Sequence, residues 1–167
     1  MSSHASPLIV QLQALLQGET DPVANAANFA ALCWLEMADI SWVGFYFVQP
    51  RGKEQELVLG PFQGKPACAR IAWGAGVCGT AAATASVQVV ADVHAFPGHI
   101  ACDPDSASEL VLPILDGDKL LGVLDIDSSC PGRFGPTEVE LMQGMLQVYL
   151  DSLRQELAPA HRAGGGH

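Results

Sequence analysis

The stretch "ELVLPILDGDKLLGVLDIDS" covers residues 109–128 and consists of two apolar segments on either side of the tetrapeptide Asp-Gly-Asp-Lys. Two short apolar runs separated by an Asp-Gly turn are a strong local signal for a β-hairpin. The stretch therefore predicts two adjacent antiparallel strands, 109–115 and 119–126. Because this hairpin is antiparallel, the other helices and strands of the chain are expected to fit an antiparallel sheet.

Four further segments upstream of the hairpin are predicted strands, because each is short, apolar and bounded by turn residues. They are "WVGFYFV" (42–48), "ELVLGPF" (56–62), "ACARIAW" (67–73) and "VQVVADV" (87–93). Helices are predicted at 7–16, 22–37, 77–84 and 137–153, with start signals at Ser6-Pro7, at Asp21-Pro22 and in a capping box at 137–140. This order predicts an α+β fold, a mostly antiparallel sheet with helices on its face. Residues 1–157 are expected to form one domain and residues 158–167 a flexible tail.

Composition excludes several classes of partner. The chain has 167 residues, 49% of them hydrophobic, and a formal net charge of −10. Without a basic run it has no surface for nucleic acid or for an anionic membrane. No apolar stretch approaches the roughly 20 residues needed to span a bilayer, and the N-terminus does not read as a signal peptide. We therefore expect a cytoplasmic protein whose five cysteines are reduced at rest.

The five cysteines lie in different sequence contexts. Cys33 is predicted to be a core residue on an apolar helix face, and Cys130 to be incidental. Cys102 lies in a polar loop that no core would favour, which indicates a reactive thiol. Cys78, at a helix start, could be core or reactive, and Cys68, in a predicted strand, could be core or a partner of the reactive thiol. The central cysteines are 10 and 24 residues apart, so they lack the close pairs typical of a structural zinc site.

Carboxylates and aromatic residues form a second group of candidates. Asp125 and Asp127 are two residues apart on one strand, so they share a face that is either solvent-exposed or a site for a cation. Glu109 begins its own strand directly after the cysteine-containing loop. Trp42 and Tyr46 also share a strand face, as a core pair or as the wall of a polar pocket.

The motifs "GPFQGKPACARI", "GAGVCGTAAAT", "DVHAFPGHIACDPDSASELVLPI" and "GVLDIDS" together resemble the free methionine-(R)-sulfoxide reductases, single-domain members of the GAF fold. The similarity runs from about Trp42 to Phe134. It implies a six-stranded antiparallel sheet, terminal helices packed on one face and a capped pocket for a small molecule. It also implies that Cys102 is the nucleophile and Cys68 the resolving cysteine, with Cys78 as a second candidate for resolution.

The resemblance further implies roles in binding the substrate. Glu109 would donate a hydrogen bond or a proton to the sulfoxide oxygen, and Asp125 and Asp127 would pair with the α-ammonium of the free amino acid. Trp42 and Tyr46 would hold the thioether. The implied reductant is a thioredoxin-like dithiol, and no metal or organic cofactor is required. The resemblance also suggests a homodimer formed through the terminal helices.

Two alternatives stay open at this point. A non-catalytic GAF module could bind a small ligand or sense oxidants through its cysteines. A thiol peroxidase could use Cys102 against peroxide. Turnover separates the first alternative from a reductase, because a sensor forms at most one disulfide per chain and no methionine.

Overall fold

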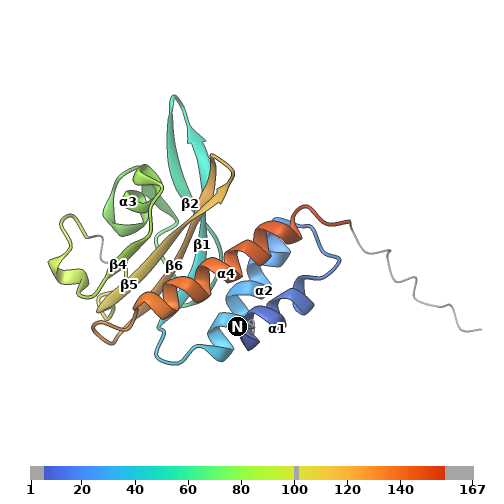
Figure 1. Ribbon diagram of the computed structural model, residues 1–167. Helices are drawn as coiled ribbons and strands as arrows, with labels where there is room; N and C mark the ends of the chain where they lie inside the picture. Colours follow the sequence, from blue (N-terminus) through green and yellow to red (C-terminus); the bar gives the residue numbers. More distant parts are fainter. Residues whose placement is uncertain (1–5, 100–101, 157–167) are drawn as a thin grey trace, which may run out of the picture.

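The computed structural model describes residues 6–99 and 102–156. It contains one six-stranded sheet in the order β3-β2-β1-β6-β5-β4, in which every neighbouring pair is antiparallel (Figure 1). The strands are β1 Trp42–Arg51, β2 Glu54–Gly64, β3 Arg70–Ala72, β4 Gln88–Val90, β5 Ser108–Asp116 and β6 Lys119–Ser128. The hairpin predicted at 109–126 is thus β5–β6, and the α+β fold is confirmed.

The helices cover both faces of the sheet. Figure 1 shows α1, α2 and α4 packed together on one face, whereas α3 lies on the other. Their bounds are α1 Pro7–Leu16, α2 Pro22–Glu36, α3 Gly76–Thr84 and α4 Pro136–Ser152, with a short 3₁₀ turn at Val93–Ala95. The terminal helices pack on one face, as predicted. Helix α3 packs on the opposite face, where it forms a second, smaller core with the sheet.

Strand β1 shows why the two cores differ. Its alternate residues Val43 and Phe45 point into the core beneath the terminal helices, where the Phe45 ring meets Phe29 edge-on at 5.2 Å and Tyr149 at 5.2 Å. Trp42 and Tyr46 point to the α3 side instead. Aromatic pairs of this kind contribute about 0.5–1.5 kcal/mol each beyond their buried area, so they add to the stability of the core beneath the terminal helices.

Two predicted strands are shorter than expected. The predicted strand 67–73 is reduced to Arg70–Ala72, so Cys68 lies in the loop before β3 and not inside a strand. The carbonyl of Cys68 accepts a hydrogen bond from the Tyr46 hydroxyl at 2.9 Å and not from a neighbouring strand. The predicted strand 87–93 is likewise shorter and ends at Val90. Val93, its last predicted residue, is instead the first residue of the 3₁₀ turn.

The start of α4 also differs from its prediction. The helix begins at Pro136 with Gly135 as the N-cap, two residues before Thr137, the N-cap of the predicted capping box. The Glu138 carboxylate accepts a hydrogen bond from the backbone N–H of Gly135 at 2.9 Å. Proline at the first helical position needs no N–H partner, which favours this earlier start.

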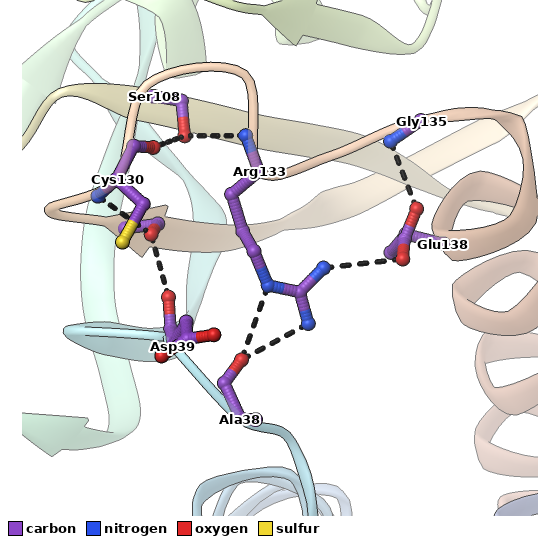
Figure 2. Close-up of polar contacts among 8 residues, drawn as sticks. Ala38, Asp39, Ser108, Cys130, Arg133, Gly135 and Glu138 are labelled. Carbon is purple, nitrogen blue, oxygen red and sulfur yellow. Dashed lines mark hydrogen bonds and ion pairs between the residues drawn. The ribbon is translucent and has the colours of Figure 1, made fainter.

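A polar network closes the end of the sheet that carries Ser108 (Figure 2). The Ser108 hydroxyl donates to the carbonyl of Cys130 at 2.6 Å and accepts from the backbone N–H of Arg133 at 3.3 Å. The Arg133 guanidinium donates to the Ala38 carbonyl at 3.1 and 3.0 Å and to Glu138 at 3.1 Å. The network joins β5 to the loop before β1 and to the start of α4, and thereby holds the strand end that precedes Glu109.

Within the described ranges 6–99 and 102–156, no helix has both the length and the apolar character needed to cross a membrane. The predicted flexible tail, 158–167, lies outside the described residues.

Candidate functional site

A pocket lies between α3 and the sheet, on the face opposite the terminal helices. It encloses about 600 Å³ including its open mouth. Strand register gathers its polar residues, because Asp127 lies opposite both Trp42 on β1 and Glu109 on β5, and Asp125 lies opposite Gly44. Three strands therefore place three carboxyl groups and an aromatic ring on one face. The pocket is lined by Trp42, Tyr46, Lys65, Pro66, Ala67, Ile71, Ala75, Gly76, Val77, Cys78, His99, Cys102, Asp103, Ser106, Glu109, Asp125 and Asp127.

The aromatic wall of the pocket also positions the loop that carries Cys68. The rings of Trp42 and Tyr46 are stacked 6.0 Å apart. Trp42 Nε1 donates to the carbonyl of Lys65 at 3.0 Å, and the Tyr46 hydroxyl donates to that of Cys68 at 2.9 Å. A side-chain carbon at Gly44 would lie 2.5 Å from the Trp42 ring, so only glycine admits the tryptophan here.

Cys68 and Cys102 form a disulfide, with Cα atoms 5.8 Å apart and a separation of 34 positions in the chain. Cys102 lines the pocket, whereas Cys68 lies outside the lining and is half-buried. Lys65 Nζ lies 2.8 Å from Asp105 and 3.5 Å from Asp103, and so joins the two cysteine loops a second time. The pairing implied by the resemblance is thus present, and the expectation that all five cysteines are reduced is wrong for these two in this structure.

Cys78 is a buried thiol at the start of α3, with 4% of its surface exposed. Its Sγ lies 3.9 Å from Glu109 Oε1, and burial, followed by the charge of Asp125, raises the thiol pKa well above its ordinary value. The helix that carries it cannot shift easily, because a side-chain carbon at Gly79 would lie 2.7 Å from the Ala72 carbonyl oxygen. Cys78 is therefore a neutral thiol fixed inside the pocket.

Without a cation beside them, the three carboxyl groups favour their protonated forms, and a bound cation would favour the charged forms. Burial, followed by the charge of Asp127, raises the pKa of Glu109 to about 8. Burial and Glu109 raise the pKa of Asp125, and burial and Asp125 raise the pKa of Asp127, both well above the ordinary range. Asp125 Oδ1 is buried without a hydrogen-bond partner in the described part of the chain, so it is available to a ligand.

A thiol and two carboxyls with ligand atoms within 4.8 Å of one another, those of Cys78, Glu109 and Asp125, are chemically able to bind a metal ion. The raised pKa values of all three groups mean that a cation would first have to displace their protons, which weakens metal binding at neutral pH. The cluster is better suited to hold and deliver a proton.

Seven of the eight candidate residues line the pocket, and the eighth, Cys68, is bonded to one of them. Cys33 is fully buried in the other core, where burial raises its thiol pKa to about 12, which confirms its core placement. Cys130 is exposed and takes part in the Figure 2 network through its backbone.

Sequence reasoning missed His99 as a pocket residue. Its Nε2 lies 3.8 Å from Glu109 Oε2, and burial, followed by the nearby His94, lowers its pKa. The sequence did contain an indication of this position. His99 lies three residues before Cys102, and a residue so close to the candidate nucleophile can face the same cavity.

Comparison with known proteins agrees with this geometry. The GAF domain model matches residues 11–148. The chain is 54% identical over 121 residues to the free methionine-R-sulfoxide reductase of Escherichia coli, covering 72% of this chain and 71% of that protein. It is 48% identical over 146 residues to the free methionine-R-sulfoxide reductase of Saccharomyces cerevisiae, covering 84% and 81%.

A solved structure is similar over most of its length. The free methionine-R-sulfoxide reductase of Neisseria meningitidis in complex with its substrate superimposes with a TM-score of 0.83 at 41% identity, covering 88% of this chain and 86% of that one. Fold, pocket cysteines and sequence identity lead to the same family. The chain belongs to the GAF domain family and, within it, to the free methionine-R-sulfoxide reductases.

Proposed function

We propose that this protein reduces free L-methionine-(R)-sulfoxide to L-methionine. The observation that carries the proposal is the Cys68–Cys102 disulfide, whose Cys102 lines a pocket with three buried or half-buried carboxyl groups. A disulfide between a pocket thiol and a thiol outside the pocket is the product expected of a sulfoxide reductase after one turnover. The relatives named above support the choice of substrate.

The first step consumes the Cys102 thiolate. It attacks the sulfoxide sulfur, the sulfoxide oxygen takes up one proton, and methionine leaves while Cys102 becomes a sulfenic acid. The thiol of Cys68 then attacks that sulfur, a disulfide forms and water leaves with the oxygen. A thioredoxin-like dithiol restores both thiols by exchange, and no further oxidant or reductant is needed.

The three carboxyl groups have different proposed roles. Glu109 and Asp125 lie together beside Cys78 at the buried side of the pocket, and their raised pKa values suit them to hold a proton for the sulfoxide oxygen. Asp127 is half-buried and lies opposite Trp42. We assign Asp127 as the main partner of the α-ammonium, with Asp125 adding its charge when the cation is bound.

Cys78 is less suited to resolve the sulfenic acid than Cys68. Its thiol is neutral, buried and held on a packed helix, whereas resolution requires a thiol that reaches Cys102. Cys68 lies on a loop and already contacts Cys102. We therefore retain Cys68 as the resolving cysteine.

We also propose that the enzyme works in the cytoplasm as a homodimer. Exposed apolar side chains on the outer side of α2, Val23, Trp34 and Leu35, support a contact through the terminal helices. Sedimentation equilibrium of the wild type and of Leu35→Glu measures this directly, with the variant expected to shift toward the monomer.

The test of the activity is incubation of the protein with free L-methionine-(R)-sulfoxide and dithiothreitol, with chromatographic detection of methionine. Many methionines per chain support the reductase. At most one disulfide per chain and no methionine would instead indicate a sensor, and faster consumption of peroxide than of sulfoxide would indicate a thiol peroxidase.

A further inference from the structure

The two oxygens of the Glu109 carboxyl face different neighbours. Oε1 lies 3.9 Å from the Sγ of Cys78, on the α3 side. Oε2 lies 3.8 Å from Nε2 of His99, on the loop that leads to Cys102. The Cys78 thiol therefore lies beside one carboxyl oxygen of Glu109, and the His99 imidazole lies beside the other.

A buried carboxyl that gives up a proton in every turnover needs a route by which the proton returns. The Glu109 side chain is 9% exposed, whereas that of His99 is 15% exposed and belongs to a surface loop. Imidazole can accept a proton at one nitrogen and donate one from the other, and its ordinary pKa lies close to neutrality. His99 thus has both the position and the chemistry to connect Glu109 with solvent.

We infer that His99 returns a proton from solvent to Glu109 Oε2 after each attack on the sulfoxide. The inference rests on the proposed function, and it names a residue that acts through Glu109. In each cycle the proton on the Glu109–Asp125 pair goes to the sulfoxide oxygen as the Cys102 thiolate attacks. The pair is left with one more negative charge, the imidazolium of His99 donates its Nε2 proton to Oε2, and solvent reprotonates the imidazole.

The electrostatic surroundings suit a residue that passes its proton on. His99 is faced by Glu109 from β5 and by His94 from the 3₁₀ turn, and burial together with His94 lowers the pKa of His99. Glu109 is faced in addition by Cys78, Asp125 and Asp127. The lowered pKa of His99 and the raised pKa of Glu109 both favour transfer of the proton from the imidazolium to the carboxylate.

The experiment measures multiple-turnover release of methionine between pH 6 and pH 9, with free L-methionine-(R)-sulfoxide and dithiothreitol in excess, because the proton that His99 returns is first needed in the second turnover. The variants are His99→Gln, His99→Ala with and without added imidazole, Glu109→Gln and the double variant His99→Gln/Glu109→Gln. The matched control is His94→Gln, which removes an exposed imidazole from the same segment.

His99→Gln should slow methionine release about 10- to 100-fold, with a loss that grows as pH rises and solvent protons become scarce. Imidazole should restore part of the rate of His99→Ala, and His94→Gln should change the rate far less than His99→Gln, because it keeps the imidazole that faces Glu109. In the Glu109→Gln background the His99→Gln change should cost little more, because both changes interrupt one route.

Two results would overturn the relay: a wild-type rate in His99→Gln at every pH, or the same loss from His99→Gln with and without Glu109. No methionine from the wild type would overturn the proposed function itself. The two failures are distinguishable because the wild type and His94→Gln test the activity, and the His99 variants test only the relay.

Discussion

Cys68 and Cys102 are bonded to each other across 34 residues of sequence, and the loop of Cys68 is held by the hydroxyl of Tyr46. The proposed nucleophile, Cys102, and its proposed resolving partner, Cys68, thus come from two loops at one end of the sheet, and Cys102 lines the pocket whereas Cys68 lies outside it. This arrangement separates attack on the sulfoxide from resolution, so the two steps can be abolished one at a time.

Cys102→Ser should abolish both turnover and single-turnover release of methionine, because a hydroxyl is a far weaker nucleophile than a thiolate. Chromatography of the quenched reaction measures the product. Cys33→Ser is unsuitable as a control since it is a core change, so exposed Cys130→Ser serves as the matched variant and should keep wild-type activity. Methionine formation by Cys102→Ser would remove Cys102 from its role.

Cys68→Ser should still release about one methionine per chain and leave Cys102 oxidised, because attack on the sulfoxide does not require Cys68. Thioredoxin-supported turnover should fall much more than this single turnover. Mass spectrometry of the oxidised wild type should show a Cys68–Cys102 bridge. A bridge between Cys78 and Cys102 as the only product would exchange the two assignments.

Asp127→Asn should weaken the use of free methionine sulfoxide by roughly 10- to 150-fold in kcat/KM, because it removes the charge that faces the α-ammonium. N-acetylation of the substrate should cost the wild type at least as much, since it removes the cation and leaves the pocket carboxylate unpaired. The variant should discriminate less between the free and the acetylated compounds. Asp125→Asn should lower the rate with both.

Equal kcat/KM values of the wild type for the free amino acid and for its N-acetyl form would contradict this assignment. A sulfoxide-containing peptide reduced as well as the free amino acid would point to the same conclusion. The carboxyl groups would then serve only the proton on the sulfoxide oxygen.

Glu109→Gln should stabilise the protein at high pH while it abolishes efficient reduction. The pKa of Glu109 is about 8 in the folded chain against an ordinary 4.5, so the folded state binds more protons between these values. Its contribution to folding stability is present below pH 4.5 and is lost as pH rises toward 8. Gln mimics the neutral acid and removes this loss, which amounts to about 2–4 kcal/mol.

Urea denaturation at pH 5 and at pH 8.5 measures the effect. The variant should gain stability over the wild type mainly at the higher pH. A gain of the same size at both pH values would mean that Glu109 does not titrate in this window, and would also remove it as a donor near neutrality.

Arg133→Met should lower the free energy of unfolding by about 1–3 kcal/mol, because it breaks the contacts with the Ala38 carbonyl and with Glu138 (Figure 2). Arg51→Met is the matched control. Its ion pair with Glu56 involves an arginine side chain that is 69% exposed, and should contribute about 0–1 kcal/mol. Urea denaturation compares the variants, and equal losses would mean that the network does not hold the strand end.

Local sequence patterns determined most of the elements. The Asp-Gly hairpin, the proline starts of α1 and α2 and the alternation in β1 depend on turn chemistry and on side-chain period, which act over a few residues. The same alternation in β6 predicts that Asp125 and Asp127 lie on one face of their strand. These features follow from the backbone and its nearest neighbours, and the structure confirms them.

Tertiary structure decided everything that depends on neighbours distant in the chain. Cys68 lies in a loop, where its carbonyl accepts a hydrogen bond from the hydroxyl of Tyr46, 22 residues away in the chain. The pKa of Glu109 is raised to about 8 because the fold buries it and because β6 places Asp127 opposite it. His99 lies near Glu109 only because their loop and strand face one cavity. Burial and electrostatic coupling arise from the folded packing, so no local pattern in the sequence contains them.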